Sequence, residues 1–146
     1  METGKHKMDQ LLTEEQKQFR QSVRSFVEKE VIPAAQEMDE RGEFPRALFQ
    51  RCAANGYFAL RYPESVGGMD AAFLTYCLMM EEIARGSLSL GAVVAMQTLM
   101  GTDLVFRFGT DEHRQRLLAP ALRGEKIGAI AMTEPDFGSD LGGITT

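Results

Sequence analysis

Cysteine and histidine are scarce in this 146-residue chain, and tryptophan is absent. The two cysteines, Cys52 and Cys77, form no CxxC pair, and His6 and His113 have no metal-ligand spacing to them or to each other. The usual sequence patterns of a structural zinc site and of a disulfide framework are therefore missing. We expect both cysteines to be reduced residues of an apolar core in an intracellular protein.

The chain also lacks an excess of basic residues. Its formal net charge is −5, and acidic and basic side chains are interspersed along it. A nucleic-acid partner is not expected, because no basic stripe is available to neutralise phosphates. The P-loop and GxGxxG signals of nucleotide sites are missing. Ser139 is not a nucleophile elbow, because Phe137 and Leu141 stand where that motif needs glycines.

Long uninterrupted apolar runs are missing as well. The most apolar stretch, residues 88–106, contains Gln97 and Asp103. A membrane-spanning helix does not easily tolerate such residues, so no membrane span is expected. Residues 1–7 are polar with no apolar segment after them, so no targeting segment is visible. We expect a cytoplasmic protein, or a mitochondrial matrix protein if the source is eukaryotic.

Helical patterns occupy most of the chain. The capping-box sequence Thr13-Glu14-Glu15-Gln16 predicts a helix start at Thr13, and Ser87 and Thr110 are further candidate caps. Pro33 is expected to break or restart the first helix, and Pro120 to kink or shift the last one. These signals predict an all-α fold of about six helices. The predicted organisation is a flexible tail over residues 1–9, a helical domain over residues 10–125, and the start of a β-domain over residues 126–146.

Two further predictions concern the helix that follows the first glycine-rich loop. Asp70 is a plausible N-cap for it, and Phe73 and Cys77 lie on its predicted apolar face. Glu81 and Glu82 resemble a catalytic carboxylate pair, but adjacent residues on a helix point about 100° apart. We therefore interpret the two glutamates as a solvated face.

The pattern changes at Ile127. The apolar, uncharged run from Ile127 to Met132 predicts a buried strand, and the proline and glycines after it predict a loop. Gly138 has no side chain to keep a ligand away. The hydroxyls of Thr133 and Ser139 can donate to carbonyl or phosphate oxygens.

This loop carries three carboxylates and no basic residue. Glu134, Asp136 and Asp140 would repel a phosphate group if they pointed toward it. At a pyrophosphate they must therefore point away, leaving backbone N–H groups and hydroxyls to bind it.

Three stretches, in this order, resemble the acyl-CoA dehydrogenase family. They are Pro63-Glu64-Ser65-Val66-Gly67-Gly68, then Phe108-Gly109-Thr110 with Gly124-Glu125, then Thr133-Glu134-Pro135 with Gly138-Ser139-Asp140. The last looks like the flavin-contacting loop of that family. The resemblance covers residues 11–146 but only the front third of a typical member. It implies the N-terminal helical domain and first middle-domain strand of an FAD-dependent enzyme that oxidises an acyl-CoA thioester to the 2,3-enoyl-CoA.

The resemblance also implies cofactor contacts along one continuous segment. The residues expected to contact FAD are Ile130, Ala131, Met132, Thr133, Glu134, Pro135, Asp136, Phe137, Gly138 and Ser139. Thr133 would face the pyrimidine edge of the flavin, and Gly138 and Ser139 would lie toward the pyrophosphate. Ser139 would also lie near the acyl-CoA thioester. Asp136 and Phe137 depart from the family pattern, in which small residues are common at these positions.

An apolar stripe supplies the other candidate substrate contacts. Val93, Met96 and Met100 recur at helical spacing, which usually indicates core. The resemblance suggests that their helix also lines an acyl-chain pocket, where methionine would suit a flexible alkyl tail. The glutamate that removes the α-proton in the family lies downstream of the loop, so no catalytic residue is assigned to this chain.

Partners and alternatives follow from the same resemblance. It implies an acyl-CoA substrate, an electron-transfer flavoprotein or similar acceptor, and a homotetramer. One alternative is a helical interaction or structural module without redox activity. Another is an acyl-CoA oxidase or flavin monooxygenase of the same superfamily. A reading frame that continues past Thr146, or a flavin absorbance spectrum of the purified protein, would separate the enzyme from the structural module.

Overall fold

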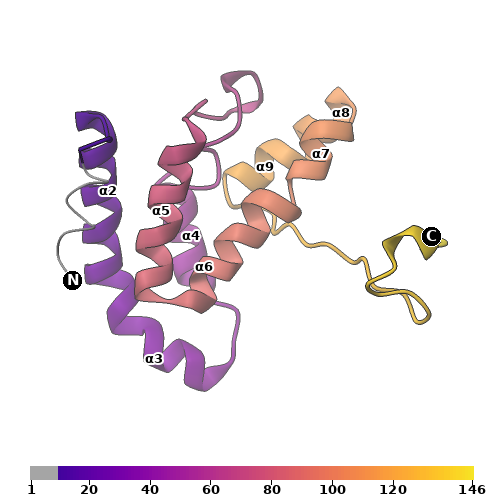
Figure 1. Ribbon diagram of the computed structural model, residues 1–146, viewed down its shortest axis with the longest axis horizontal. Coiled ribbons are helices and arrows are strands. Elements are labelled where there is room, and N and C mark those ends of the chain that lie inside the picture. Colours follow the sequence, from indigo (N-terminus) through magenta and orange to yellow (C-terminus); the bar gives the residue numbers. More distant parts are fainter. Residues whose placement is uncertain (1–9) are drawn as a thin grey trace.

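The computed structural model describes residues 10–146, which form a helical body followed by an extended C-terminal tail (Figure 1). The α-helices are α2 (Glu14–Phe26), α3 (Ile32–Arg41), α4 (Arg46–Ala54), α5 (Phe73–Gly86), α6 (Leu88–Ala95), α7 (Asp103–Phe108), α8 (Asp111–His113) and α9 (Ala119–Leu122). The π-helical segments are η1 (Val27–Val31), η3 (Met96–Met100) and η4 (Arg114–Leu118), and the 3-10 turns are η2 (Glu64–Val66) and η5 (Leu141–Gly143). The tail predicted over residues 1–9, with His6, lies outside the described residues.

The helices pack around one main apolar core. Helix α5 packs against both α2 and α6, and α3 crosses one end of the body (Figure 1). Fully buried members of this core come from successive helices: Val23, Phe49, Met79, Leu90 and Val94. Each such side chain contributes about 1.5–3 kcal/mol when it is removed from water. The predicted all-α fold is confirmed.

Short-range signals place three of the helix starts correctly. Thr13 Oγ1 accepts a hydrogen bond from the N–H of Gln16, and Gln16 Oε1 accepts one from the N–H of Thr13. Ser87 caps α6 through its hydroxyl. Thr110 caps α8, and His113 Nδ1 accepts from the N–H of Thr110 at 3.3 Å. His113 therefore completes a helix cap.

Neither Pro33 nor Pro120 ends its helix. Each follows a π turn, in which Ile32 N–H donates to the carbonyl of Val27 and Ala119 N–H donates to that of Arg114, five residues earlier. A proline ring in an α-helix collides with the carbonyl four residues before it, and the wider π turn gives that carbonyl room. Residues 10–146 therefore contain five helical stretches where about six were predicted: 14–41, 46–54, 73–86, 88–108 and 111–122.

The buried face of α5 differs from the predicted one. Tyr76, Met79 and Ile83 face the core, whereas Phe73 is 61% exposed and Cys77 is exposed. The predicted face lay one residue further along, which rotates it by about 100° around the helix. The prediction that Cys77 is a core residue is therefore wrong.

Cys52 is buried as predicted. Burial, followed by the nearby Glu30 carboxylate, raises the pKa of the Cys52 thiol to about 12. A thiol with so high a pKa carries almost no thiolate at neutral pH, so Cys52 is a packing residue.

The loop before α5 folds back onto Tyr62. The N–H of Asp70 donates to the carbonyl of Tyr62 at 2.8 Å, and Asp70 has a φ of 49°. This geometry places Asp70 in the loop, and the N-cap of α5 is Ala72, so the prediction that Asp70 is the cap is wrong. A Cβ atom on Gly68 would lie 1.9 Å from the Tyr62 carbonyl oxygen. Only glycine allows so close a backbone approach.

Glu82 does not belong to a solvated face. Its side chain is 2% exposed, and its carboxylate accepts hydrogen bonds from Arg24 at 2.5 and 3.1 Å and from Arg85 at 3.0 Å. Burial alone would raise the pKa of Glu82, but these hydrogen bonds outweigh burial and lower it. Glu81 remains exposed, as predicted. The interpretation was wrong for Glu82 because its principal partner lies 58 residues away, on α2.

The strand predicted over residues 127–132 does not form within residues 10–146. This stretch is extended, and Ile127 and Met132 are 46% and 40% exposed. A strand needs a neighbouring strand for its ladder of hydrogen bonds, and the described residues contain no strand at all.

One helix, Leu88–Phe108, is long and apolar enough to cross a membrane by length and composition alone. The core helix of a soluble protein passes the same test. Gln97 and Thr98 in the middle of this helix are each 1% exposed and are hydrogen-bonded to neighbouring segments of the protein. Specific polar contacts of this kind favour the interpretation as a core helix.

Candidate functional site

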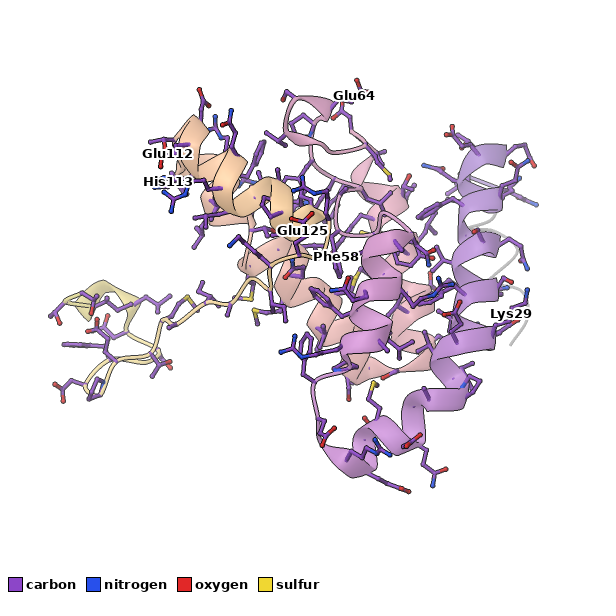
Figure 2. All side chains as sticks on the ribbon, turned by 180° about the vertical axis from the view of Figure 1, so that it is seen from behind. Lys29, Phe58, Glu64, Glu112, His113 and Glu125 are labelled. Carbon is purple, nitrogen blue, oxygen red and sulfur yellow. The ribbon has the colours of Figure 1, made fainter. Side chains whose placement is uncertain are left out.

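The predicted cofactor segment, residues 130–139, begins where the chain leaves the helical body. After Glu125 the backbone passes Gln97 of η3. It then runs away from the helices, so that its tip stands apart from them (Figures 1 and 2). Ile130 is half-buried, and Ala131, Met132 and Thr133 are exposed. The segment is therefore extended backbone with one end fixed to the helical domain.

A tight turn follows the extended part. Glu134 N–H donates to the carbonyl of Phe137 at 2.9 Å, and Phe137 N–H donates back to that of Glu134 at 3.3 Å. The Glu134 carboxylate accepts hydrogen bonds from the backbone N–H groups and the hydroxyls of Thr145 and Thr146. The Thr146 hydroxyl makes the largest contribution to lowering the pKa of Glu134 to about 2. One of the three carboxylates of the loop is thus held within the loop itself.

The end of the segment is open. A Cβ atom on Gly138 would meet only the Thr133 methyl group, at 3.9 Å. The Phe137 ring lies against Gly143, where an added Cβ would be 2.3 Å from the ring. The Ser139 hydroxyl is exposed and caps no helix, since the N-cap of η5 is Asp140. The bulky ring therefore leaves the space beside Gly138 free.

These residues fit a flavin nucleotide in their hydrogen-bonding capacity. Within residues 10–146, the backbone N–H and C=O groups of residues 130–133 bond to no other described group. The hydroxyls of Thr133 and Ser139 are exposed, and the Glu134 carboxylate is engaged elsewhere. Such a strip offers free donors and acceptors along its length, which is what a flavin ring edge and a pyrophosphate need.

The candidate acyl-chain residues lie on a different part of the domain. Val93 is partly buried against the main core, whereas Met96 and Met100 are 37% and 38% exposed. Their helix buries its other face, at Leu90 and Val94. The structure does not bring Ser139 to these residues, because the tail that carries it runs away from the helices (Figure 1).

A buried polar network around η3 was missed by sequence reasoning. Tyr62 OH donates to the Thr98 carbonyl at 2.8 Å and lies 2.7 Å from Thr102 Oγ1. Thr102 Oγ1 donates to the Gln97 carbonyl at 2.6 Å, and Tyr76 OH lies 2.8 Å from Thr98 Oγ1. Polar residues inside an otherwise apolar helix were the available signal, and they were interpreted only as an argument against a membrane span.

A family model described as "Acyl-CoA dehydrogenase, N-terminal domain" matches residues 13–125. Among curated relatives, benzylmalonyl-CoA dehydrogenase of Aromatoleum aromaticum is 49% identical over 139 residues, which are 95% of this chain and 37% of that protein. The chain therefore spans somewhat more than a third of the length of this relative.

Solved structures agree with this match. The acyl-CoA dehydrogenase of Geobacillus kaustophilus superposes with a TM-score of 0.84 at 35% identity, covering 92% of this chain and 35% of that one. A glutaryl-CoA dehydrogenase of Mycobacterium smegmatis in complex with FADH2 superposes with a TM-score of 0.87 at 25% identity, covering 94% and 36%. Residues 13–125 thus have both the sequence and the fold of one known domain, and the chain belongs to the acyl-CoA dehydrogenase family.

Proposed function

We propose that this chain contributes the N-terminal helical domain and the first flavin contacts of an FAD-dependent acyl-CoA dehydrogenase. The observation that carries the proposal is the open segment 130–139, which follows directly on a domain of this family. Its unpaired backbone and exposed hydroxyls supply hydrogen-bonding groups. The negative charge of Glu134 is already engaged in hydrogen bonds from Thr145 and Thr146. A bound FAD would supply the acceptor for the hydride that leaves the β-carbon of the acyl-CoA.

The chain's own residues would position the cofactor and the substrate. Thr133 and the backbone before it would bind the flavin ring edge, and Gly138 would let the pyrophosphate approach the backbone. Ser139 would donate its hydroxyl toward the pyrophosphate or the thioester side. Met96 and Met100, half-exposed on their helix, would cover the acyl chain.

The remaining roles would fall to residues outside these 146. The carboxylate that takes the α-proton would come from the chain beyond Thr146. The electron acceptor would be an electron-transfer flavoprotein or a similar carrier. The protein would assemble as a homotetramer, and it would be located in the cytoplasm or the mitochondrial matrix. The FADH2 complex of the glutaryl-CoA dehydrogenase supports the choice of cofactor.

Acyl-CoA-dependent dye reduction tests the proposal. A protein that continues past Thr146 through the length of the relatives is expected to reduce an acceptor dye when a saturated acyl-CoA is added. The 146-residue chain alone is expected to be inactive, because the family's catalytic carboxylate has no counterpart in it. Activity of the short chain, or inactivity of the long one with both straight-chain and aryl-substituted thioesters, would contradict the proposal.

Ser139→Ala is expected to weaken flavin retention or raise KM about ten-fold or more in the longer protein. A hydroxyl that donates to a charged phosphate contributes about 1.5–3 kcal/mol, and 1.4 kcal/mol corresponds to a factor of ten. Flavin content after dialysis and KM for acyl-CoA are the measurements. Ser89→Ala is the control, since the Ser89 hydroxyl donates to Asp39 on α3, far from the loop in sequence. Unchanged values for both variants would show that Ser139 is only a turn residue.

A further inference from the structure

Gln97 lies beside residues 126–128, which connect the helical domain to the candidate flavin segment, residues 130–139. Its side chain is 1% exposed and belongs to η3. Nε2 donates to the carbonyl of Ala121 at 2.9 Å and to that of Lys126 at 3.0 Å. Oε1 accepts from the N–H of Gly128 at 2.7 Å. One buried amide therefore binds one backbone group in α9 and two in the segment that follows α9.

The partners fix the orientation of this amide. Two of its contacts are carbonyl oxygens, which can only accept, and the third is an N–H group, which can only donate. The NH2 group must face the carbonyls of Ala121 and Lys126, and the oxygen must face Gly128. A glutamate would lose both donors, and an asparagine is one methylene too short. The side chain is matched to this backbone in both length and polarity.

A backbone contact brings Gly128 within reach of the amide. A Cβ atom on Gly101 would lie 2.5 Å from the carbonyl carbon of Gly128, and one on Gly128 would lie 2.9 Å from that of Gly101. Two glycines are required for chains to approach so closely. The Gln97 carbonyl is itself held by the Thr102 hydroxyl. The amide therefore projects from a fixed point of η3.

Packing alone does not hold residues 126–128 in place. A cavity of about 210 Å³ lies beside Gly128 and is lined in part by Val105, Leu117 and Ile127. Ile127 is 46% exposed. Polar contacts from Gln97, together with the Gly101 contact, are thus the main restraints on residues 126–128.

We propose that Gln97 is a positioning residue that sets the place and direction of the flavin segment, which begins two residues after Gly128. This inference rests on the proposed function for its consequence, but its structural part concerns this chain alone. A fixed start shortens the stretch of backbone that must be ordered when a ligand binds to residues 130–139. Loss of the Gln97 hydrogen bonds would leave more backbone to be ordered when the ligand binds.

The test uses two glutamine variants that remove side-chain hydrogen bonds from different parts of the backbone in and after α9. Gln97→Met keeps the length of the side chain and removes all three hydrogen bonds. Gln50→Met is the matched control, because Gln50 Nε2 donates to the carbonyl of Gly124 at 2.8 Å, four residues upstream of Gly128. Both variants lose side-chain hydrogen bonds to the backbone of residues 121–128. Only the first frees residues 126–128.

Amide hydrogen exchange on the 146-residue chain is the first measurement. The Gly128 amide is expected to exchange slowly in the wild-type chain and in Gln50→Met, and at least ten-fold faster in Gln97→Met. Equal Gly128 protection in all three would overturn the inference, whether or not the protein binds flavin. If Gln97→Met does not fold, Gln97→Asn, which keeps an amide that cannot reach, is expected to give the same exchange pattern.

Flavin affinity of the longer protein is the second measurement. The dissociation constant for FAD is expected to rise about ten-fold in Gln97→Met, because at least one more residue must be ordered on binding, and to stay within about two-fold in Gln50→Met. A merely structural role would lower the Tm of both variants and leave both affinities alike. A wild-type protein that binds no FAD would contradict the proposed function. The exchange result would still decide whether Gln97 holds residues 126–128 in place.

Discussion

An Arg24→Met variant is expected to unfold about 3 kcal/mol more easily than the wild-type chain, the lower end of what breaking a buried ion pair costs. Glu82 is 2% exposed and, among residues 10–146, would keep only Arg85 as its partner. Arg24 and Arg85 are 33% and 39% exposed, so each can extend its guanidinium into water. Glu82→Met, which removes the buried charge itself, is therefore expected to cost less. Urea unfolding followed by circular dichroism measures both.

The dependence on pH provides a second check on Arg24→Met. The pKa of Glu82 is lowered in the folded chain, so its stabilising contribution is complete above its ordinary pKa of 4.5 and is lost as the pH falls through the lower folded value. In Arg24→Met this pKa rises, because burial acts against fewer hydrogen bonds. The stability gap between wild type and variant should therefore narrow below pH 4.5. A gap that widens on acidification, or a greater loss in Glu82→Met, would contradict the account of this pair.

Gly68→Ala is expected to lower the free energy of unfolding by about 3 kcal/mol, at the upper end of what overpacking usually costs. The new Cβ would lie 1.9 Å from the backbone oxygen of Tyr62, which cannot move without disturbing the Tyr62 hydroxyl at Thr98. Thermal unfolding and the near-ultraviolet spectrum of the tyrosines are the measurements.

The neighbouring glycine is a matched control for Gly68→Ala. Gly67 has a φ of 85° and nothing within 4 Å of an added Cβ, so Gly67→Ala brings only left-handed backbone strain, about 1 kcal/mol. Equal losses in the two variants would show that backbone strain, and not the contact with Tyr62, explains why glycines occupy this loop.

Most helix caps, which depend on neighbouring residues, were predictable from the sequence, and Asp70 was the exception. The caps at Thr13, Ser87 and Thr110 need only the next few residues, and all three were placed correctly. The consequences of Pro33 were not predictable in the same way. Whether a proline breaks a helix depends on whether the preceding turn can widen, and the residues before Pro33 carry no pattern that distinguishes a π turn from an α turn. The effect of Pro120 was not predictable for the same reason, since a π turn also precedes it.

Features that depend on distant residues were missed. Glu82 is buried because Arg24 reaches it from α2, and Cys77 is exposed because α5 is rotated by one residue from the predicted face. The candidate flavin segment came from resemblance, since its residues alone predict only a strand and a loop. Gln97 could have been found, because a single amide in a long apolar helix needs several hydrogen-bond partners. Which backbone groups supply them became clear only when α9 and Gly128 were placed beside it.

An anaerobic titration of bound flavin with acyl-CoA tests the assignment to a working dehydrogenase most directly. The sample is the purified protein that continues past Thr146, carrying its own flavin. Addition of one equivalent of a suitable acyl-CoA is predicted to bleach the visible absorbance of the oxidised flavin and to yield one equivalent of 2,3-enoyl-CoA. Protein that retains no flavin, or flavin that no saturated straight-chain or aryl-substituted acyl-CoA can reduce, would contradict the assignment.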